Sequence, residues 1–434
     1  MSEASRAGGP LTSGGHPDLR HPRPLIYARP TRTAVAEHFV GRAAELTLFD
    51  RCIAELDGGS SAAIELVGEP GIGKTRLLAE LAARAEARGC LVSSGSASEL
   101  EQDLPFWVFV DAFDEYLHGL DPRWLDELED GVEAELATVF PSLSSLGVGR
   151  VVAPQHERYR SHRAVRALLE LLASTQPLVV MLDDLHWCDQ ASVELLGALL
   201  HRPPAAPVLM AVAARPRQLR ERLSTGLERA RRVGSLARLD LIALTAGEAH
   251  DLLGEGVAGD QLAGLYQESG GNPFYLEQLA RTAHRGPTVA VPTRELSVGG
   301  VDVPRAVMAA LAEELALLSP GARRVLEGAA VAGDPFDPDL AGAAAGVGEP
   351  AAIDAFDELL ALDVIRATDV PRRFRFRHPL VRRAVYEAAP GGWLLGAHER
   401  TAVALADRGA PASARASRRE RRASRRSRRG RRPA

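Results

Sequence analysis

The chain has 434 residues, 46% of them hydrophobic and 25% charged, which is enough for roughly two to four domains with substantial cores. No apolar run reaches the roughly 18 residues that a membrane span needs, and no hydrophobic segment follows the first residues, so we expect neither a membrane span nor a secretory signal. Its three cysteines, Cys52, Cys90 and Cys188, are far apart, which argues against a disulfide framework or a zinc site and favours the cytoplasm.

The first feature with chemical content is a glycine-rich loop after a short apolar run. Residues 1–36 are rich in Gly, Pro, Ser, His and Arg without periodicity, so we expect them to be disordered, and an over-extended start of the reading frame is the alternative. The pattern predicts a helix over Ala43–Leu56, a buried strand over Ala63–Val67 and an amphipathic helix over Thr75–Arg88. Between this strand and the second helix stands Gly-Glu-Pro-Gly-Ile-Gly-Lys-Thr, which fits the P-loop pattern Gly-x-x-x-x-Gly-Lys-Thr.

The P-loop predicts a phosphate-binding site. Its backbone N–H groups and the helix N-terminus cradle phosphates, and the hydroxyl of Thr75 reaches Mg²⁺. Lys74 is the only lysine, and the other 51 of the 52 basic residues are arginine, which indicates that this position needs a compact ammonium on a flexible stem. A glycine-rich turn that binds nothing is the alternative. The residues assigned to phosphate binding are Gly68, Glu69, Pro70, Gly71, Ile72, Gly73, Lys74, Thr75 and Arg76.

A second apolar run ends in paired carboxylates. Leu178–Asp183 has the pattern of a buried strand, and Asp183 and Asp184 stand at its carboxyl end, where ligands bind in open α/β sheets. We assign Asp183 to the Mg²⁺ shell, and Asp184 to orienting or deprotonating the attacking water. The alternative is that these aspartates only cap the next helix.

An arginine follows a neighbouring strand. Further strands are predicted at Leu91–Ser94, Val208–Ala213 and Leu239–Leu244, and Arg215 stands just after the second of them. In P-loop ATPases, a polar residue at the end of the strand beside the carboxylate strand often senses the γ-phosphate. A guanidinium there would stabilise charge during phosphoryl transfer. An ordinary solvated arginine is the alternative.

The second half of the chain is largely helical. The pattern is helical from Thr245 to about Arg285, and residues 286–302 have the composition of a linker. After it, Val364–Thr368 and Arg373–Arg377 could pair as the wing of a winged helix. The helices predicted around this pair are Pro304–Leu318, Pro320–Val331, Pro338–Ala344, Ala351–Leu362 and Pro379–Ala388.

Four motifs occur in the order that is typical of one family. They are Phe39–Arg42 (FVGR), the P-loop, Leu182–Asp189 (LDDLHWCD) and Gly271–Phe274 (GNPF). Together they resemble the STAND-type AAA+ ATPases. The resemblance is closest to the ATPase region of large ATP-binding LuxR-type bacterial regulators related to the maltose regulator MalT, a region also described as an origin-recognition-complex-like AAA ATPase domain. It covers about residues 38–408.

The resemblance implies roles that the residues alone do not show. Val40, Gly41 and Arg42 would lie over the adenine and ribose. Asn272 and Pro273 would close a lid against the base, although a helix-breaking turn at this position is the alternative.

For His378, the resemblance implies a contact with the β-phosphate of ADP, and capping of the next helix is the alternative. The implied cofactors are ATP or ADP with Mg²⁺. ADP would hold the winged helix against the nucleotide domain. Exchange for ATP, promoted by an unknown inducer or regulatory protein, would free the module to self-associate, with slow turnover.

The predicted fold class is therefore α/β. We expect a P-loop NTPase of the AAA+/STAND type with a parallel sheet and helices on both faces, followed by a helical lid and a winged-helix domain. The predicted domains are a disordered segment (1–36), the P-loop domain (37–245), the lid (246–285), a linker (286–302), the winged-helix-like domain (303–408) and a disordered Arg-rich tail (409–434).

The C-terminal tail departs from the family, whose full-length members continue with helical repeats and a DNA-binding helix-turn-helix. Residues 415–434 hold eleven arginines and one glutamate, a net +10, so the rest of the chain carries −15 of the total of −5. The tail fits a frameshift product, a basic tail that binds nucleic acid or an acidic surface, or a segment that neutralises the acidic body. We see no helix-turn-helix pattern in this sequence, so the DNA binding that is typical of the family is not predicted for this chain. No membrane partner is expected.

The leading functional hypothesis is an ATP-binding, slowly hydrolysing signalling switch of a LuxR-type transcriptional regulator. A P-loop phosphotransferase, such as a kinase acting on a small molecule, is the second hypothesis, although no separate substrate-binding motif is visible. The third is a truncated interaction protein whose basic tail binds nucleic acid.

Overall fold

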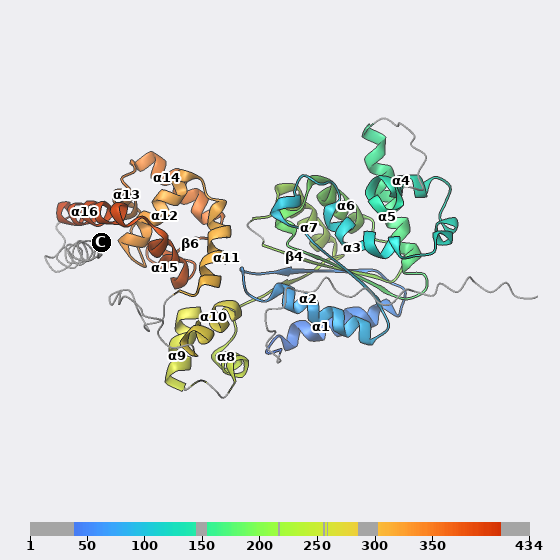
Figure 1. Cartoon of the computed structure of the whole chain (residues 1–434), viewed down its shortest axis with the longest axis horizontal. Coiled ribbons are helices and arrows are strands. Elements are labelled where there is room, and N and C mark those ends of the chain that lie inside the picture. The colour runs from blue at the N-terminus through green and yellow to red at the C-terminus, as the bar shows by residue number, and fades with distance from the viewer. Residues whose placement is uncertain are drawn as a thin grey trace, which may run out of the picture.

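The computed structural model describes residues 39–144, 154–215, 218–254, 257, 259–284 and 303–408. The predicted N-terminal segment, linker and Arg-rich tail lie outside these residues. Within them, a five-stranded sheet covered by helices is followed by a helical half that contains a small hairpin (Figure 1). No described helix is long and apolar enough to cross a membrane.

The sheet is parallel throughout and places two chemically important strand ends near each other. Its order is β2-β3-β4-β1-β5. The strands are β1 (Ala62–Val67), β2 (Leu91–Ser96), β3 (Leu178–Asp183), β4 (Val208–Ala214) and β5 (Ala237–Asp240). Because the strands are parallel, the P-loop after β1 and the aspartates after β3 are at the same edge of the sheet, with only β4 between their strands, and ligands bind at this edge in open α/β folds.

Helices cover both faces of the sheet, as predicted. Successive side chains of a strand point to opposite faces. Accordingly Leu178, Val180 and Leu182 join one core cluster, and Val179 and Met181 join another. The first cluster packs against α3 (Trp107–His118), α5 (Pro154–Leu172), α6 (Gln190–His201) and α7 (Glu221–Val233). The second packs against α1 (Ala43–Leu56) and α2 (Lys74–Ala87), on the other side of the sheet in Figure 1.

The last strand is shorter at its C-terminal end than predicted. We expected Leu239–Leu244, whereas β5 ends at Asp240. The amide of Leu241 still bonds to the carbonyl of Val67, but the next backbone groups have other partners. The carbonyl of Ile242 accepts from Arg42, and the amide of Leu244 donates to Gly271. The prediction was wrong because an apolar run does not reveal that distant groups pair with its backbone.

The region between β2 and β3 is mostly helical. Besides α3 and α5 it contains η1 (Glu99–Glu101), η2 (Pro122–Glu127), α4 (Val132–Val139) and η3 (Pro141–Leu143). Asp189 anchors this region to the sheet, because its carboxylate accepts from the backbone amides of Phe106 and Trp107 at 3.0 and 3.1 Å. The same carboxylate caps α6 through the amide of Ser192.

The helical half forms one continuous core. The helices α8 (Ala246–Leu253), α9 (Gly259–Ser269) and α10 (Pro273–His284) precede α11 (Arg305–Ala316), α12 (Pro320–Ala332), α13 (Pro338–Ala345), α14 (Glu349–Ala361), α15 (Pro379–Ala388) and α16 (Gly391–Asp407). Leu276 of α10 and Val307 of α11 belong to the same buried cluster. The helices of the predicted lid therefore pack with the C-terminal helices as one unit.

The predicted strand pair is present between α14 and α15. Strand β6 (Ile365–Ala367) pairs antiparallel with β7 (Phe374–Phe376). Phe336, which follows α12, bridges to Phe374 and extends this small sheet by one residue. The hairpin stands beside α11, on the side of the helical half that faces the five-stranded sheet in Figure 1.

Candidate functional site

The P-loop connects β1 to α2 with the backbone that its glycines allow. Gly71 and Gly73 have φ values of 75° and 102°, which residues with a side chain rarely adopt. Lys74 is only 6% exposed, and its Nζ donates to the carbonyls of Gly68 and Glu69 at 3.0 and 3.1 Å. The ammonium is thus folded back over its own loop, where a phosphate would be in reach.

Burial, and after it the nearby guanidinium of Arg215, lowers the pKa of Lys74 to about 8. The carboxylates of Asp183, Asp184 and Glu314 oppose this effect. An anion bound on the loop would stabilise the charged ammonium and offset part of the cost of burying its charge. The loop therefore has the electrostatics of an anion-binding site.

Thr75 and Asp183, the two predicted metal-binding residues, touch each other. The hydroxyl of Thr75 donates to Oδ2 of Asp183 at 2.5 Å, and Oδ1 of Asp183 accepts from the amide of Asp184 at 2.8 Å. A hydroxyl and a carboxylate are the oxygen donors that Mg²⁺ prefers, and Mg²⁺ normally completes its shell with waters and substrate phosphates. No group of three or more His, Cys, Asp or Glu side chains that could hold a metal occurs among the described residues. The pair therefore fits Mg²⁺ that is bound together with a nucleotide.

Asp184 occupies a strained position beside this pair. Its φ of 51° lies in the left-handed region, which aspartate tolerates better than most residues. Burial, and after it the neighbouring charge of Asp183, raises the pKa of Asp184 to about 6. A carboxyl with a raised pKa at a strand end is suited to accept a proton or to orient a water.

Arg215 follows β4 directly and belongs to the same polar cluster. One of its terminal nitrogens donates to Oε1 of Gln218 at 3.4 Å, and its Nε has no hydrogen-bond partner among the described residues. Its charge acts on Lys74, Asp184 and His186. The structure thus brings the predicted phosphate sensor close to the P-loop and the paired aspartates.

The residues expected over the adenine and ribose contact the protein backbone. Arg42 donates to the carbonyls of Ile72 and Ile242 at 3.2 and 2.7 Å. Gly41 has a φ of 72°, which residues with a side chain rarely adopt, and a Cβ there would lie 2.5 Å from Oε1 of Glu248, so this carboxylate would have to move. This segment, which also includes Val40, therefore joins the P-loop to the start of α8.

Asn272 and Pro273 stand at the N-terminus of α10, directly against the P-loop. The side-chain amide of Asn272 donates to the carbonyl of Pro70 at 2.9 Å. The amide of Phe274 donates to the carbonyl of Gly71 at 3.3 Å. The turn is therefore more than a helix break, because it docks α10 onto the phosphate-binding loop.

His378 takes the capping role that was the alternative to a phosphate contact. Its Nδ1 accepts from the amide of Leu380 at 3.1 Å, which caps α15. Burial lowers the pKa of His378 to about 4, and its ring lies against Gly270 and, at 4.7 Å between centroids, against Tyr275. The imidazole is neutral and packed at the junction of the lid helices and α15.

The sequence did not predict the contact between the P-loop and the C-terminal hairpin. Arg366 of β6 donates to Oε1 of Glu69, the second residue of the P-loop. Asp363 holds the same guanidinium through two hydrogen bonds of 3.0 and 2.9 Å. Beside it, the buried guanidinium of Arg377 forms two hydrogen bonds with Glu314, at 2.5 and 2.9 Å. No spacing signal could have revealed contacts between residues so far apart.

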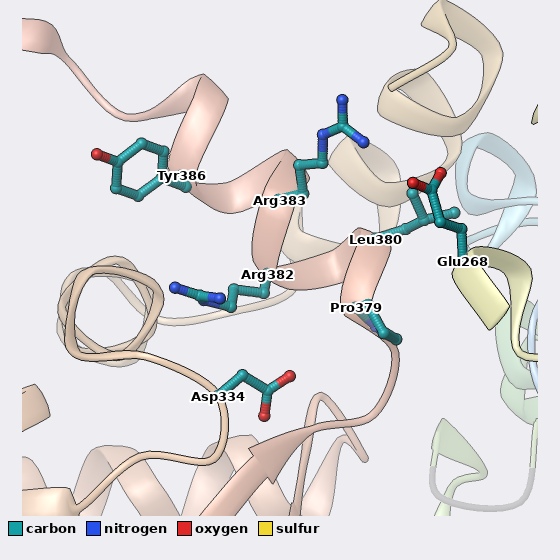
Figure 2. Close-up of a pocket in the computed structure, with 7 residues that line it drawn as sticks. All are labelled: Glu268, Asp334, Pro379, Leu380, Arg382, Arg383 and Tyr386. Atoms are coloured by element: carbon teal, nitrogen blue, oxygen red, sulfur yellow. The ribbon is translucent and has the colours of Figure 1, made fainter. Parts of the chain in front are cut away.

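A separate hollow lies where the lid helices meet the C-terminal helices (Figure 2). Its volume is about 110 Å³, and no P-loop residue lines it. Its lining comes from α9, α15 and the segment after α12: Glu268, Asp334, Pro379, Leu380, Arg382, Arg383 and Tyr386. The hollow is therefore separate from the P-loop at the edge of the sheet.

Comparison with known proteins supports the assignment of this edge. Residues 38–212 match the family model described as an AAA ATPase domain. An uncharacterised protein of Rhizobium meliloti (strain 1021), R02095, is 26% identical over 352 residues, which cover 76% of this chain and 33% of that protein. The chain thus spans about a third of the length of this relative.

Several solved structures have detectable similarity to this chain. One is a STAND protein with a tetratricopeptide repeat sensor, PH0952, from Pyrococcus horikoshii, with 15% identity, a TM-score of 0.32 and coverage of 86% of this chain and 46% of that chain. Another is a RuvB mutant from Thermotoga maritima, with 16% identity, a TM-score of 0.37 and coverage of 81% and 97%. A third is the ORC2 protein of Aeropyrum pernix, with 14% identity, a TM-score of 0.35 and coverage of 81% and 96%.

The family match and the local geometry agree: residues 38–212 are similar to an AAA ATPase domain, and the loop between β1 and α2 has the glycine backbone of a P-loop.

Proposed function

We propose that the chain is an ATP-binding, slowly hydrolysing switch in which the bound nucleotide decides whether the C-terminal helical domain stays docked on the P-loop. In this proposal the docked state holds ADP, and the ATP state self-associates. We assign the switch to a LuxR-type transcriptional regulator related to MalT, with residues 303–408 acting as its winged-helix domain. The order of the four sequence motifs supports this finer assignment.

The observation that carries the proposal is the pairing of Arg366 with Glu69. Glu69 belongs to the P-loop itself, so a change in loop conformation on nucleotide exchange would act directly on the C-terminal hairpin. Asn272 adds a second contact between the loop and the helical half. The same loop that holds phosphates is therefore also the docking surface for the rest of the molecule.

The strength of this docking suits a reversible switch. The side chains of Arg366 and Glu69 are 37% and 30% exposed, and a pair with such access to water contributes about 1 kcal/mol or less. A ligand can shift a two-state equilibrium only by its differential affinity for the two states. Because the Arg366–Glu69 contact is weak, a modest difference between ADP and ATP in their affinity for the docked state suffices to break it.

The assigned residues divide the work of binding and hydrolysis. Lys74 would leave the loop carbonyls for the phosphates, and Thr75 and Asp183 would hold Mg²⁺, which when bound neutralises phosphate charge. Asp184 would orient the attacking water, and Arg215 would stabilise charge on the γ-phosphate. Asn272, Pro273 and the segment Val40–Arg42 would frame the base, and His378 would contact the β-phosphate after release from its capping role.

The first test identifies the nucleotide that accompanies the purified chain. The chain is denatured and the released nucleotide is separated, in parallel with Lys74→Ala. We expect near-stoichiometric ADP from the wild type and none from the variant, together with a larger particle by light scattering after ATP loading. No bound nucleotide and no affinity for ATP would refute the switch, whereas fast turnover that depends on a small-molecule acceptor would favour a phosphotransferase.

A further inference from the structure

A buried histidine beside the paired aspartates has no role in the site described above. His186 belongs to η4 (Leu185–Trp187), the turn that follows Asp184, and it is 7% exposed. Neither of its ring nitrogens has a hydrogen-bond partner among the described residues. Most buried polar groups are hydrogen-bonded, so an imidazole with two unpaired nitrogens requires an explanation.

The surroundings of the ring are those of the candidate catalytic cluster. Nδ1 of His186 lies 3.8 Å from Oδ1 of Asp184, which is too long for a hydrogen bond but close enough for a small rotation to form one. Burial, and after it the charges of Arg215 and Lys74, lowers the pKa of His186 to about 3. The imidazole is therefore neutral near pH 7 and carries one N–H donor and one acceptor nitrogen.

We infer that His186 is a positioning residue for ATP hydrolysis, whose Nδ1–H orients the carboxylate of Asp184 toward the attacking water. The inference rests on the proposed ATPase function. The left-handed backbone of Asp184 turns the chain so that His186 comes back beside the carboxylate, and such strain is common at functional sites. Hydrogen bonds of catalytic groups are often long without substrate and shorten in the reactive complex.

A purely structural role makes a different prediction from a positioning role. The ring of His186 also lies 5.2 Å from that of Trp187, so it could serve only to fill space. In that case an apolar residue of similar size would preserve turnover. Under the positioning role the same replacement removes two unpaired polar atoms from the interior, so it should preserve or raise stability while turnover falls.

Three variants test the inference, with ATP turnover, ADP and ATP affinity and the unfolding temperature measured for each. The amide nitrogen of His186→Asn reproduces the position of Nδ1, that of His186→Gln reproduces Nε2, and His186→Leu reproduces neither. We expect turnover to fall by about tenfold to a hundredfold in the Leu and Gln variants, the range seen for residues that orient an active group, and to be largely retained in the Asn variant. Affinities should stay within about twofold, because the ring does not hold the nucleotide. His201→Ala, at the exposed end of α6, is the control.

The outcomes separate this inference from the proposed function. A wild type that hydrolyses ATP, with a Leu variant that is equally fast, overturns only the role of His186. Loss of affinity and stability in parallel with turnover, without recovery in the Asn variant, also overturns it in favour of a structural role. A wild type that binds ATP but never hydrolyses it overturns the hydrolysis itself and, with it, the inference.

Discussion

The P-loop has two sides that are held in different ways. On the side of the sheet, Thr75 bonds to Asp183, and both stand at ends of neighbouring elements in one domain. On the side of the helical half, Glu69 pairs with Arg366 across 297 positions of sequence, and the pair is partly open to water. In the proposed function, the first side binds and hydrolyses the nucleotide, and the second reports which nucleotide is bound.

The difference teaches that chemistry and control can share one loop while depending on different side chains. Substitutions on the sheet side should abolish binding or hydrolysis, whereas substitutions on the other side should alter only the rate at which nucleotide leaves. The predictions below test this division, from the largest expected effect to the smallest.

The largest effect is expected at Lys74. Lys74→Ala should weaken nucleotide binding at least about a hundredfold, because it removes the buried ammonium that would bind the phosphates. That factor corresponds to about 2.8 kcal/mol. Titration with a fluorescent nucleotide measures it, and Lys74→Arg is the matched control. If the arginine variant binds as tightly as the wild type, the argument from the single lysine fails.

A large effect on turnover alone is expected at Asp184. Asp184→Asn should slow hydrolysis on the order of a hundredfold, the lower range for a general base or water-orienting group, while ATP affinity changes little. Single-turnover hydrolysis and equilibrium binding measure the two quantities separately. Equal losses in the rate of hydrolysis and in the affinity for ATP would show that Asp184 acts in binding. Asp184 would then not be a residue that acts in hydrolysis alone.

A smaller effect is expected at the docking contact. Arg366→Glu should speed ADP release by a few fold, because the contact contributes about 1 kcal/mol or less. Chasing a fluorescent ADP with unlabelled nucleotide measures the rate. Combining Arg366→Glu with Glu69→Arg should restore part of the slow release. A double variant in which the two effects simply add would show that the pair is not coupled.

The smallest effect is expected at Glu268, in the hollow of Figure 2. Burial raises the pKa of Glu268 above its ordinary 4.5, so the folded state binds this proton more tightly than the unfolded state does. Wild-type stability should therefore decline as the pH rises above about 4.5, and Glu268→Gln should not share this decline. Unfolding temperatures of both proteins from pH 4.5 to 7 measure the difference. The unfolding temperature of the variant minus that of the wild type should therefore increase with rising pH. A difference that stays constant or decreases would contradict the prediction.

The sheet and its nucleotide loop could be predicted because their signals are local. A strand, a glycine turn and a helix follow one another within β1, the P-loop and α2, and the apolar run Leu178–Asp183 became β3 with the predicted bounds. The end of β5 could not be predicted, because it depends on Arg42 and Gly271 pairing with its backbone. Local sequence carries no record of such partners.

The helical half shows the same limit more strongly. Its helices and the β6–β7 hairpin follow from periodicity, but the pairing of Arg366 with Glu69 exists only because two separately patterned units dock. His378 illustrates a related limit, because a histidine before a proline at a helix start can cap the helix or face a ligand, and only packing decides between these roles. Residue roles at the junction of the two halves therefore required the structure.

The most direct test of the switch measures the distance between the two halves in each nucleotide state. Spin labels on Glu86→Cys in α2 and Asp354→Cys in α14 occupy exposed positions, whereas Cys52, Cys90 and Cys188 are buried. With ADP we predict one narrow distance distribution that corresponds to the docked structure, and with a slowly hydrolysed ATP analogue we predict a longer, broader one. Identical distributions at saturating concentrations of both nucleotides would contradict the account, because the P-loop would then bind nucleotide without moving the C-terminal domain.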